Sequence, residues 1–181
     1  TLTDSKALLV ISESENVDRL PQGAWNVVLV DSDKDEWADL PEDNLKVPAH
    51  EQQLAYVLFT SGSTGRPKGV AINQGNVAAL LAWGATAYYR ERHAFTLTAT
   101  SVCFDLSVYE IFLTLQLGGC LVLVDNAFAL AGLPHWVTLV NTVPSAIKEL
   151  VDINGIPASV ATINLAGEPL RRDLVDRLYA L

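Results

Sequence analysis

The chain has 181 residues, about the size of one domain, and half of them are apolar, so a sizeable buried core is expected. Its formal net charge of −9 argues against nucleic acid and anionic membrane surfaces as partners, because both attract clustered Lys and Arg. The longest apolar runs are only as long as strands, and we find neither a signal peptide nor a transmembrane segment, so we expect a cytoplasmic protein.

Cysteine and histidine give no sign of a metal centre. The two cysteines, Cys103 and Cys120, are expected to be buried thiols in a reducing compartment. The three histidines, His50, His93 and His135, are scattered and show no metal-ligand spacing. We therefore predict no metal site within the chain.

The first third of the chain predicts short strands separated by polar loops. Residues 7–11 and 26–30 are apolar enough for two buried strands, and the acidic segment 31–44 between them and the next element is expected to be a solvated loop. A third strand is predicted at 55–60, and strand character resumes at 70–72 after a glycine-rich loop.

From residue 75 onward, helical and strand patterns alternate. Helices are predicted at 75–89, 106–118, 144–153 and 171–181, and strands at 95–100, 120–125, 136–143 and 162–168. Alternation of this kind, with continuous apolar strands, predicts an α/β fold in which a mostly parallel sheet is flanked by helices on both faces.

Polar residues gather where several of these strands end. Asp105 follows the strand at 95–100, Asn141 lies near the end of the next strand but one, and Asn164 and Ala166 lie near the end of the last strand. Ligands of parallel α/β sheets bind beyond the carboxyl ends of the strands, so these residues are expected to share a pocket.

The glycine-rich loop, TSGSTGRPKG at 60–69, has the parts needed to grip phosphates. Its glycines let the backbone approach a ligand closely, successive N–H groups can hold an anion, and the hydroxyls and Lys68 add donors. It is not the loop of a P-loop NTPase, because Pro67 precedes Lys68 and Gly69 follows it. Composition alone also allows an ordinary hairpin loop.

The stretch LAYVLFTSGSTGRPKGV at 54–70 resembles the phosphate-binding core motif of the AMP-forming adenylation superfamily, which includes nonribosomal peptide synthetase adenylation domains, acyl-CoA synthetases and luciferases. The resemblance implies that this loop contacts the β- and γ-phosphates of ATP, with Lys68 in a catalytic role. The implied phosphate-binding residues are Thr60, Ser61, Gly62, Ser63, Thr64, Gly65 and Lys68.

The segment FDLSVYEIF at 104–112 resembles the next core motif of the peptide-synthetase branch. The resemblance implies that Asp105 pairs with the α-ammonium group of an amino acid, which acyl-CoA synthetases have no need to bind. Asp105 could also cap the helix predicted to begin near Leu106, and the two roles are compatible.

The segment NLAGEPL at 164–170 resembles the family segment that precedes the adenine-binding motif, although Glu168 could simply be a capping or surface acid. The implied substrate-binding residues are Asp105, Leu106, Tyr109, Asn141, Asn164, Ala166 and Gly167. Their residue types resemble specificity codes associated with alanine, with Tyr109 where Phe is usual. The alternative for Asn141 and Asn164 is that they satisfy backbone groups at strand ends.

The resemblance covers nearly the whole chain and makes it one piece of the large N-terminal subdomain of an adenylation domain. Residues 1–50 hold the preceding strands and the acidic loop, 51–72 the phosphate-binding loop region and 73–181 the amino-acid-pocket subdomain. The chain lacks Met and its last helix has no C-cap signal, so we expect an excerpt from a larger protein. The C-terminal subdomain and the adenine and ribose motifs would lie outside it, and the chain alone is expected to be inactive.

The implied reaction of the parent has two steps. The carboxylate of an amino acid attacks the α-phosphate of ATP to give aminoacyl-AMP and pyrophosphate, with Mg²⁺ as cofactor. The acyl group then passes to the phosphopantetheine thiol of a peptidyl carrier protein, so the carrier and neighbouring synthetase domains are implied partners. The alternatives are an acyl- or aryl-acid CoA ligase of the same superfamily and a non-catalytic substrate-binding subdomain.

Overall fold

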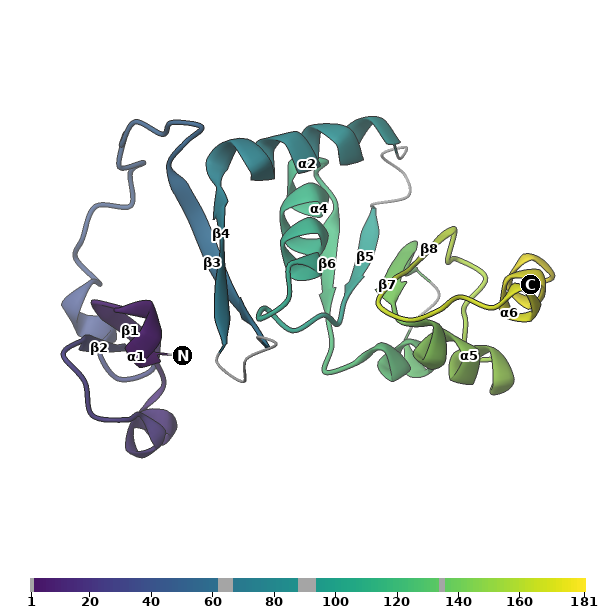
Figure 1. Ribbon diagram of the computed structural model, residues 1–181, viewed down its shortest axis with the longest axis horizontal. Helices are drawn as coiled ribbons and strands as arrows, with labels where there is room; N and C mark the ends of the chain where they lie inside the picture. The colour runs from purple at the N-terminus through teal and green to yellow at the C-terminus, as the bar shows by residue number, and fades with distance from the viewer. Residues whose placement is uncertain (1, 62–66, 88–93, 134–135) are drawn as a thin grey trace. The chain divides into compact units, whose positions relative to one another are not determined.

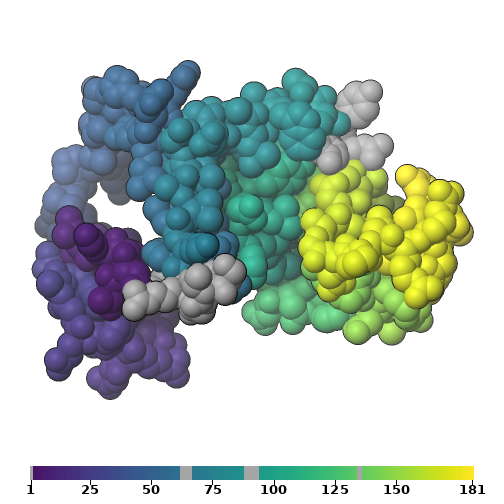
Figure 2. All heavy atoms as spheres, viewed as in Figure 1, coloured from purple at the N-terminus to yellow at the C-terminus, as the bar shows by residue number. Residues whose placement is uncertain are grey.

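The computed structural model describes residues 2–61, 67–87, 94–133 and 136–181 (Figure 1). The chain, whose heavy atoms are drawn in Figure 2, is divided by its backbone contacts into two compact units. One contains residues 1–49 and 59–70, and the other contains residues 50–58 and 71–181.

The first unit is built around a small parallel pair of strands. Its elements are α1 (Leu2–Ser5), β1 (Leu9–Ser12), the 3-10 helix η1 (Ser14–Arg19), β2 (Asn26–Leu29) and the 3-10 helix η2 (Lys34–Glu36). β1 and β2 pair in register from Leu9 opposite Asn26 to Ser12 opposite Leu29. The two strands predicted here are confirmed, and most of the acidic segment that follows β2 is exposed.

β3 (Leu54–Thr60) and β4 (Lys68–Asn73) form a second, two-stranded sheet. Residues 61–67 connect them, which is too short for a parallel crossover, so the two strands run antiparallel. They lie side by side in Figure 1. The strand predicted before the glycine-rich loop and the strand predicted after it therefore pair with each other, while residues 62–66 of the loop lie outside the described residues.

The second unit contains a four-stranded, fully parallel sheet in the order β6-β5-β7-β8. The strands are β5 (Phe95–Thr98), β6 (Cys120–Leu123), β7 (Leu139–Thr142) and β8 (Thr162–Leu165). The helices of this unit include α2 (Gln74–Ala87), the 3-10 helix η5 (Ala127–Gly132), α5 (Pro144–Asp152) and α6 (Arg172–Tyr179). The predicted α/β fold, with a parallel sheet flanked by helices, is confirmed.

Alternating side chains place helices on the two faces of this sheet. Leu97 and Val140 point into an apolar core with Ile147 and Leu150 of α5, and Leu174 of α6 belongs to the same core. The neighbouring residues of the strands point the other way, because successive side chains of a strand alternate between faces. On that second face the Thr114 hydroxyl donates to the Thr96 hydroxyl across 2.8 Å.

The helical stretch on the second face differs from the single α-helix predicted at 106–118. It consists of α3 (Leu106–Val108), the π-helix η4 (Tyr109–Leu113) and α4 (Thr114–Gln116). A π-turn fits an extra residue into the helix and is frequent at functional sites. Residues of this segment therefore face directions that the 3.6-residue period does not predict.

α2 crosses this π-helical segment at Gly84. A Cβ atom at Gly84 would lie only 2.5 Å from Leu113 Cδ2. Leu113 is fully buried, so glycine is what allows the two helical segments to approach so closely.

The expectation for the cysteines is wrong, since both thiols belong to exposed residues. Cys103 lies in the turn that follows β5, and Cys120 begins the edge strand β6, so neither is enclosed by the core. Among the residues that the structure describes, no helix combines the length and apolarity needed to cross a membrane.

Candidate functional site

The second unit contains a cavity of about 670 Å³ at the carboxyl ends of β7 and β8. Its walls come from β3, β4, α2, the start of the helical stretch after Asp105, and the two strands themselves. It is lined by Tyr56, Ile72, Asn76, Val77, Leu80, Trp83, Asp105, Leu106, Tyr109, Asn141, Ile163, Asn164, Leu165 and Ala166. A volume in this range suits a small-molecule ligand.

Six of the seven predicted substrate-binding residues line this one cavity, although they are up to about sixty positions apart in the chain. They are Asp105, Leu106, Tyr109, Asn141, Asn164 and Ala166. The seventh, Gly167, does not line it and instead adopts a positive φ of 84° in the turn after β8. Their contact with a substrate stays a prediction.

Asp105 supplies the only charge among the described residues that line the cavity. It directly precedes α3 with helical backbone angles, φ −61° and ψ −28°, and its side chain makes no capping hydrogen bond. The capping role is therefore not used, and the carboxylate remains exposed at the cavity.

Tyr56 lies in the same cavity and responds to this charge. Burial, and then the negative charge of Asp105, raise the pKa of the Tyr56 phenol above its usual value. The sequence reasoning missed Tyr56 and the α2 residues of the cavity wall, because they belong to elements that precede the motif in which Asp105 was found.

The buried carboxyl group of Glu110 is hydrogen-bonded to the cavity residue Asn141 but does not itself line the cavity. Glu110 follows Tyr109 in the π-helical segment and is 0% exposed. Its Oε1 accepts hydrogen bonds from the Thr100 hydroxyl at 2.7 Å and from Asn141 Nδ2 at 3.2 Å, and its Oε2 accepts from the Thr100 backbone N–H at 3.4 Å. Burial raises the pKa of the Glu110 carboxyl despite these donors.

The two asparagines of the cavity are joined by the sheet register. Asn141 of β7 pairs with Asn164 of β8, so the two side chains emerge next to each other on the same face. Asn164 Nδ2 donates to Asn141 Oδ1 across 2.9 Å. The asparagines therefore bond to side chains in a chain that runs from Thr100 through Glu110 to Asn164, rather than serving only the backbone at the strand ends.

Glu168 turns out to be a capping acid, but for a helix that precedes it in the chain. Its carboxylate accepts from the Ser145 backbone N–H and hydroxyl, both at 2.9 Å, at the first turn of α5. A carboxylate at a helix N-terminus satisfies N–H groups that have no partner within the helix.

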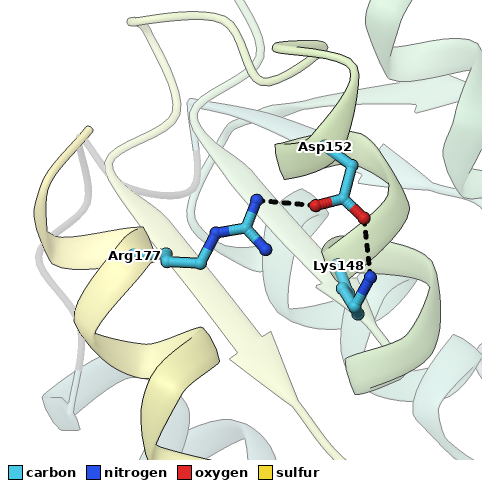
Figure 3. A network of polar contacts seen from close by, with 3 residues as sticks. All are labelled: Lys148, Asp152 and Arg177. Atoms are coloured by element: carbon cyan, nitrogen blue, oxygen red, sulfur yellow. Dashed lines mark hydrogen bonds and ion pairs between the residues drawn. The ribbon is translucent and has the colours of Figure 1, made fainter.

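An ion-pair network joins the C-terminal half of α5 to α6 (Figure 3). Asp152 accepts from Lys148 Nζ and from Arg177 Nη2, each at 2.6 Å. The hydrogen bonds from Lys148 and then Arg177 lower the pKa of Asp152 below its usual value. The network ties together the two helices that cover the core face of the sheet.

The predicted phosphate-binding loop is only partly described. Thr60 and Ser61 lie at the end of β3 and Lys68 begins β4, and all three are exposed members of the first unit. Gly62, Ser63, Thr64 and Gly65 lie outside the described residues. Within the described ranges, His, Cys, Asp and Glu form no group that could hold a metal ion.

Comparison with known proteins decides the family. The model for AMP-binding enzymes matches residues 1–181. The chain belongs to the AMP-binding enzyme family.

Curated relatives of this AMP-binding chain are much longer than it is. A linear gramicidin synthase polypeptide of Brevibacillus parabrevis is 49% identical over 183 residues, which cover 100% of the chain and 4% of the relative. The AMB antimetabolite synthetase AmbB of Pseudomonas aeruginosa is 44% identical, covering 98% of the chain and 14% of the relative. The chain thus spans a small part of each.

Two solved structures of similar fold contain bound small molecules. The complex of VinN with L-aspartate has a TM-score of 0.82 and 26% identity, covering 99% of the chain and 49% of VinN. The peptide synthetase FmoA3 in its AMPPNP-bound form has a TM-score of 0.81, covering 99% of the chain and 20% of FmoA3; at 23% identity it supports the fold alone.

Proposed function

We propose that this AMP-binding chain forms the amino-acid pocket of a peptide-synthetase adenylation domain, which joins an α-amino acid to AMP and releases pyrophosphate from ATP. The observation that carries the proposal is Asp105, the single charge among the described lining residues of a largely apolar cavity. Asn141, Asn164 and Ala166 of the neighbouring strand ends share this cavity with it.

The chemistry of Asp105 favours an α-amino acid. A carboxylate beside apolar walls is best stabilised by a cationic partner that makes charge-assisted hydrogen bonds. The described residues of the wall offer no such cation, and an α-ammonium group would supply one. Acyl and aryl acids lack that group and would leave the carboxylate without a cationic partner.

The comparisons support the same assignment. The relatives include the phosphinothricin tripeptide synthetase PhsB, and the VinN structure holds L-aspartate. For this chain, Thr60, Ser61 and Lys68 would hold the phosphates of ATP, and Mg²⁺ would stabilise their developing charge. The product would be loaded onto the phosphopantetheine thiol of a peptidyl carrier protein.

We further propose that the amino acid is small, with L-alanine preferred. The cavity as a whole is far larger than alanine, so the selection must come from the part around Tyr109, Asn141 and Asn164, where bulky Tyr109 is only 6% exposed. A pocket rejects a larger side chain by clash but discriminates one methylene group by only about 1–3 kcal/mol. Glycine and serine should therefore be activated weakly as well.

The test uses the intact parent protein and amino-acid-dependent ATP–pyrophosphate exchange. Alanine is compared with propionate, which lacks the ammonium group, in the wild type and in Asp105→Asn. Loss of the charge should lower the preference for alanine over propionate by about 10–100-fold, because a hydrogen bond to a charged group contributes about 1.5–3 kcal/mol. Asp43→Asn, an exposed aspartate that does not line the cavity, is the matched control.

Three outcomes would contradict the proposal. An unchanged alanine-to-propionate ratio in Asp105→Asn would remove the ammonium-binding role. A wild type that activates acyl or aryl acids better than any amino acid would favour a CoA ligase. A panel in which phenylalanine or tryptophan is the best substrate would leave the amino-acid assignment intact but refute the small pocket.

A further inference from the structure

Glu110 is an acidic residue at a fully buried position, where apolar residues are usual. It is fully buried on the second face of the sheet, and no ion pair among the described residues includes it. Its carboxylate accepts hydrogen bonds from two groups of Thr100 and from the amide of Asn141. Burying a carboxyl group without a cation lowers stability, so an apolar residue of similar size would pack here at lower cost.

The hydrogen bonds of Glu110 determine how the next side chain is oriented. An asparagine amide is nearly symmetric in shape, and only its partners decide which end carries the oxygen. Glu110 Oε1 is an acceptor, so it holds the Nδ2 end of Asn141 at 3.2 Å. The oxygen end of Asn141 is then directed to Asn164, whose Nδ2 donates to it at 2.9 Å.

The chain of contacts therefore begins outside the cavity and ends in it. Thr100 and Glu110 do not line the cavity, whereas Asn141 and Asn164 do. We propose that Glu110 is a positioning residue for substrate selection. It fixes the orientation of the Asn141 amide, and Asn141 in turn fixes the orientation of the Asn164 amide. These orientations determine which polar atoms face the side chain of the amino-acid substrate. This inference rests on the proposed function, because it assigns the two asparagines to the substrate side chain.

A purely structural role is the competing explanation, and the same helical stretch provides a matched control. Thr114 and Thr96 are both 0% exposed on the same face of the sheet, and their hydroxyls are hydrogen-bonded at 2.8 Å. Neither lines the cavity, and the hydrogen bonds of Glu110 go to Thr100 and Asn141 instead. Thr114→Val therefore removes a buried polar contact close in sequence without touching the chain of contacts that leads to Asn164.

The experiment measures substrate discrimination in the intact parent protein. The variants are Glu110→Ala, Glu110→Gln, Thr100→Val and Thr114→Val, and pyrophosphate exchange gives kcat/KM for alanine and for serine, together with the KM for ATP. A structural defect lowers both kcat/KM values together, whereas a positioning defect changes their ratio. Thermal unfolding of each variant reports the structural part separately.

We expect Glu110→Ala to change the alanine-to-serine ratio by about 10-fold, because Asn141 loses the acceptor that decides its orientation and the two ends of its amide can exchange. The KM for ATP should not change. Glu110→Gln should stay within about threefold of the wild-type ratio, since a glutamine oxygen can still accept from Asn141 Nδ2 and from the Thr100 hydroxyl. Thr100→Val should change the ratio by roughly threefold in the same direction as Glu110→Ala, and Thr114→Val should lower stability alone.

Three results would overturn the positioning role of Glu110. A ratio in Glu110→Ala that matches that of Thr114→Val would overturn the inference and leave the proposed function intact. If Glu110→Ala does not fold, an unchanged ratio in Thr100→Val overturns it. If the wild-type parent activates no amino acid at all, the proposed function fails and this inference fails with it.

Discussion

Replacing Gly84 with alanine tests how closely α2 packs on the π-helical segment. The added Cβ would lie 2.5 Å from Leu113 Cδ2, 3.2 Å from Cδ1 and 3.4 Å from Cγ. Carbon atoms pack best at about 3.5–4.0 Å, so one of the two helical segments or the leucine must move by about 1 Å. Leu113 is 0% exposed and has no solvent to move into.

Two opposing effects determine how much Gly84→Ala changes the free energy of unfolding. Overpacking of this kind costs about 1–3 kcal/mol. Alanine is favoured over glycine inside a helix by roughly 1 kcal/mol, which offsets part of that cost. Gly84→Ala should therefore lower the free energy of unfolding by about 1 kcal/mol.

The decisive assay repeats the substitution in a Leu113→Ala background. With the leucine truncated, the clash disappears and only the helix preference remains, so Gly84→Ala should there raise stability by up to about 1 kcal/mol. Urea denaturation followed by tryptophan fluorescence gives both values. The reasoning is refuted if Gly84→Ala is stabilising with Leu113 present, or if its effect is the same in the two backgrounds.

Two further predictions concern charged groups. Lys68→Ala should slow pyrophosphate exchange by about 10–100-fold while the KM for the amino acid stays within threefold, because its charge is assigned to phosphate; Lys34→Ala, an exposed lysine of the acidic segment, is the control, and equal exchange rates would contradict the assignment. Asp152→Asn should lower the urea midpoint at neutral pH, since Lys148 and Arg177 depress the folded-state pKa of Asp152. A depressed carboxyl pKa stabilises the fold above its unfolded-state pKa, and this contribution is lost as the pH falls through the folded-state pKa. The difference between wild type and variant should therefore vanish in acid, and a difference independent of pH would refute the ion-pair explanation.

The parallel sheet was predictable because burial dictates its sequence pattern. Residues 121–124, LVLV, form a continuous apolar run, and such runs between helical segments are typical of strands covered on both faces. The predicted strand at 136–143 is longer than β7 (Leu139–Thr142), since the flanking apolar residues continue the pattern without continuing the ladder.

Asp105 and the strand-end asparagines were predicted to meet because parallel strands end at the same edge of a sheet. Glu110 was not predicted. In the run YEIFL it reads as the solvent-facing residue of an amphipathic helix, and only the π-turn and the donors from Thr100 and Asn141 reveal it as buried. Thr100 and Asn141 lie 10 and 31 positions from Glu110 in the sequence, so no local pattern reveals these hydrogen bonds. The π-turn also changes the direction in which Glu110 points, and a 3.6-residue period does not predict that change.

The side-by-side register of Asn141 and Asn164 bears on how such pockets change during evolution or in a library of variants. Each amide uses the other as a hydrogen-bond partner, so a substitution at one position alters the chemical surroundings of the other before any substrate binds. Variants that exchange these residues one at a time would pass through intermediates with a broken pair. Transplanting a new specificity should succeed more often when positions 110, 141 and 164 are exchanged together.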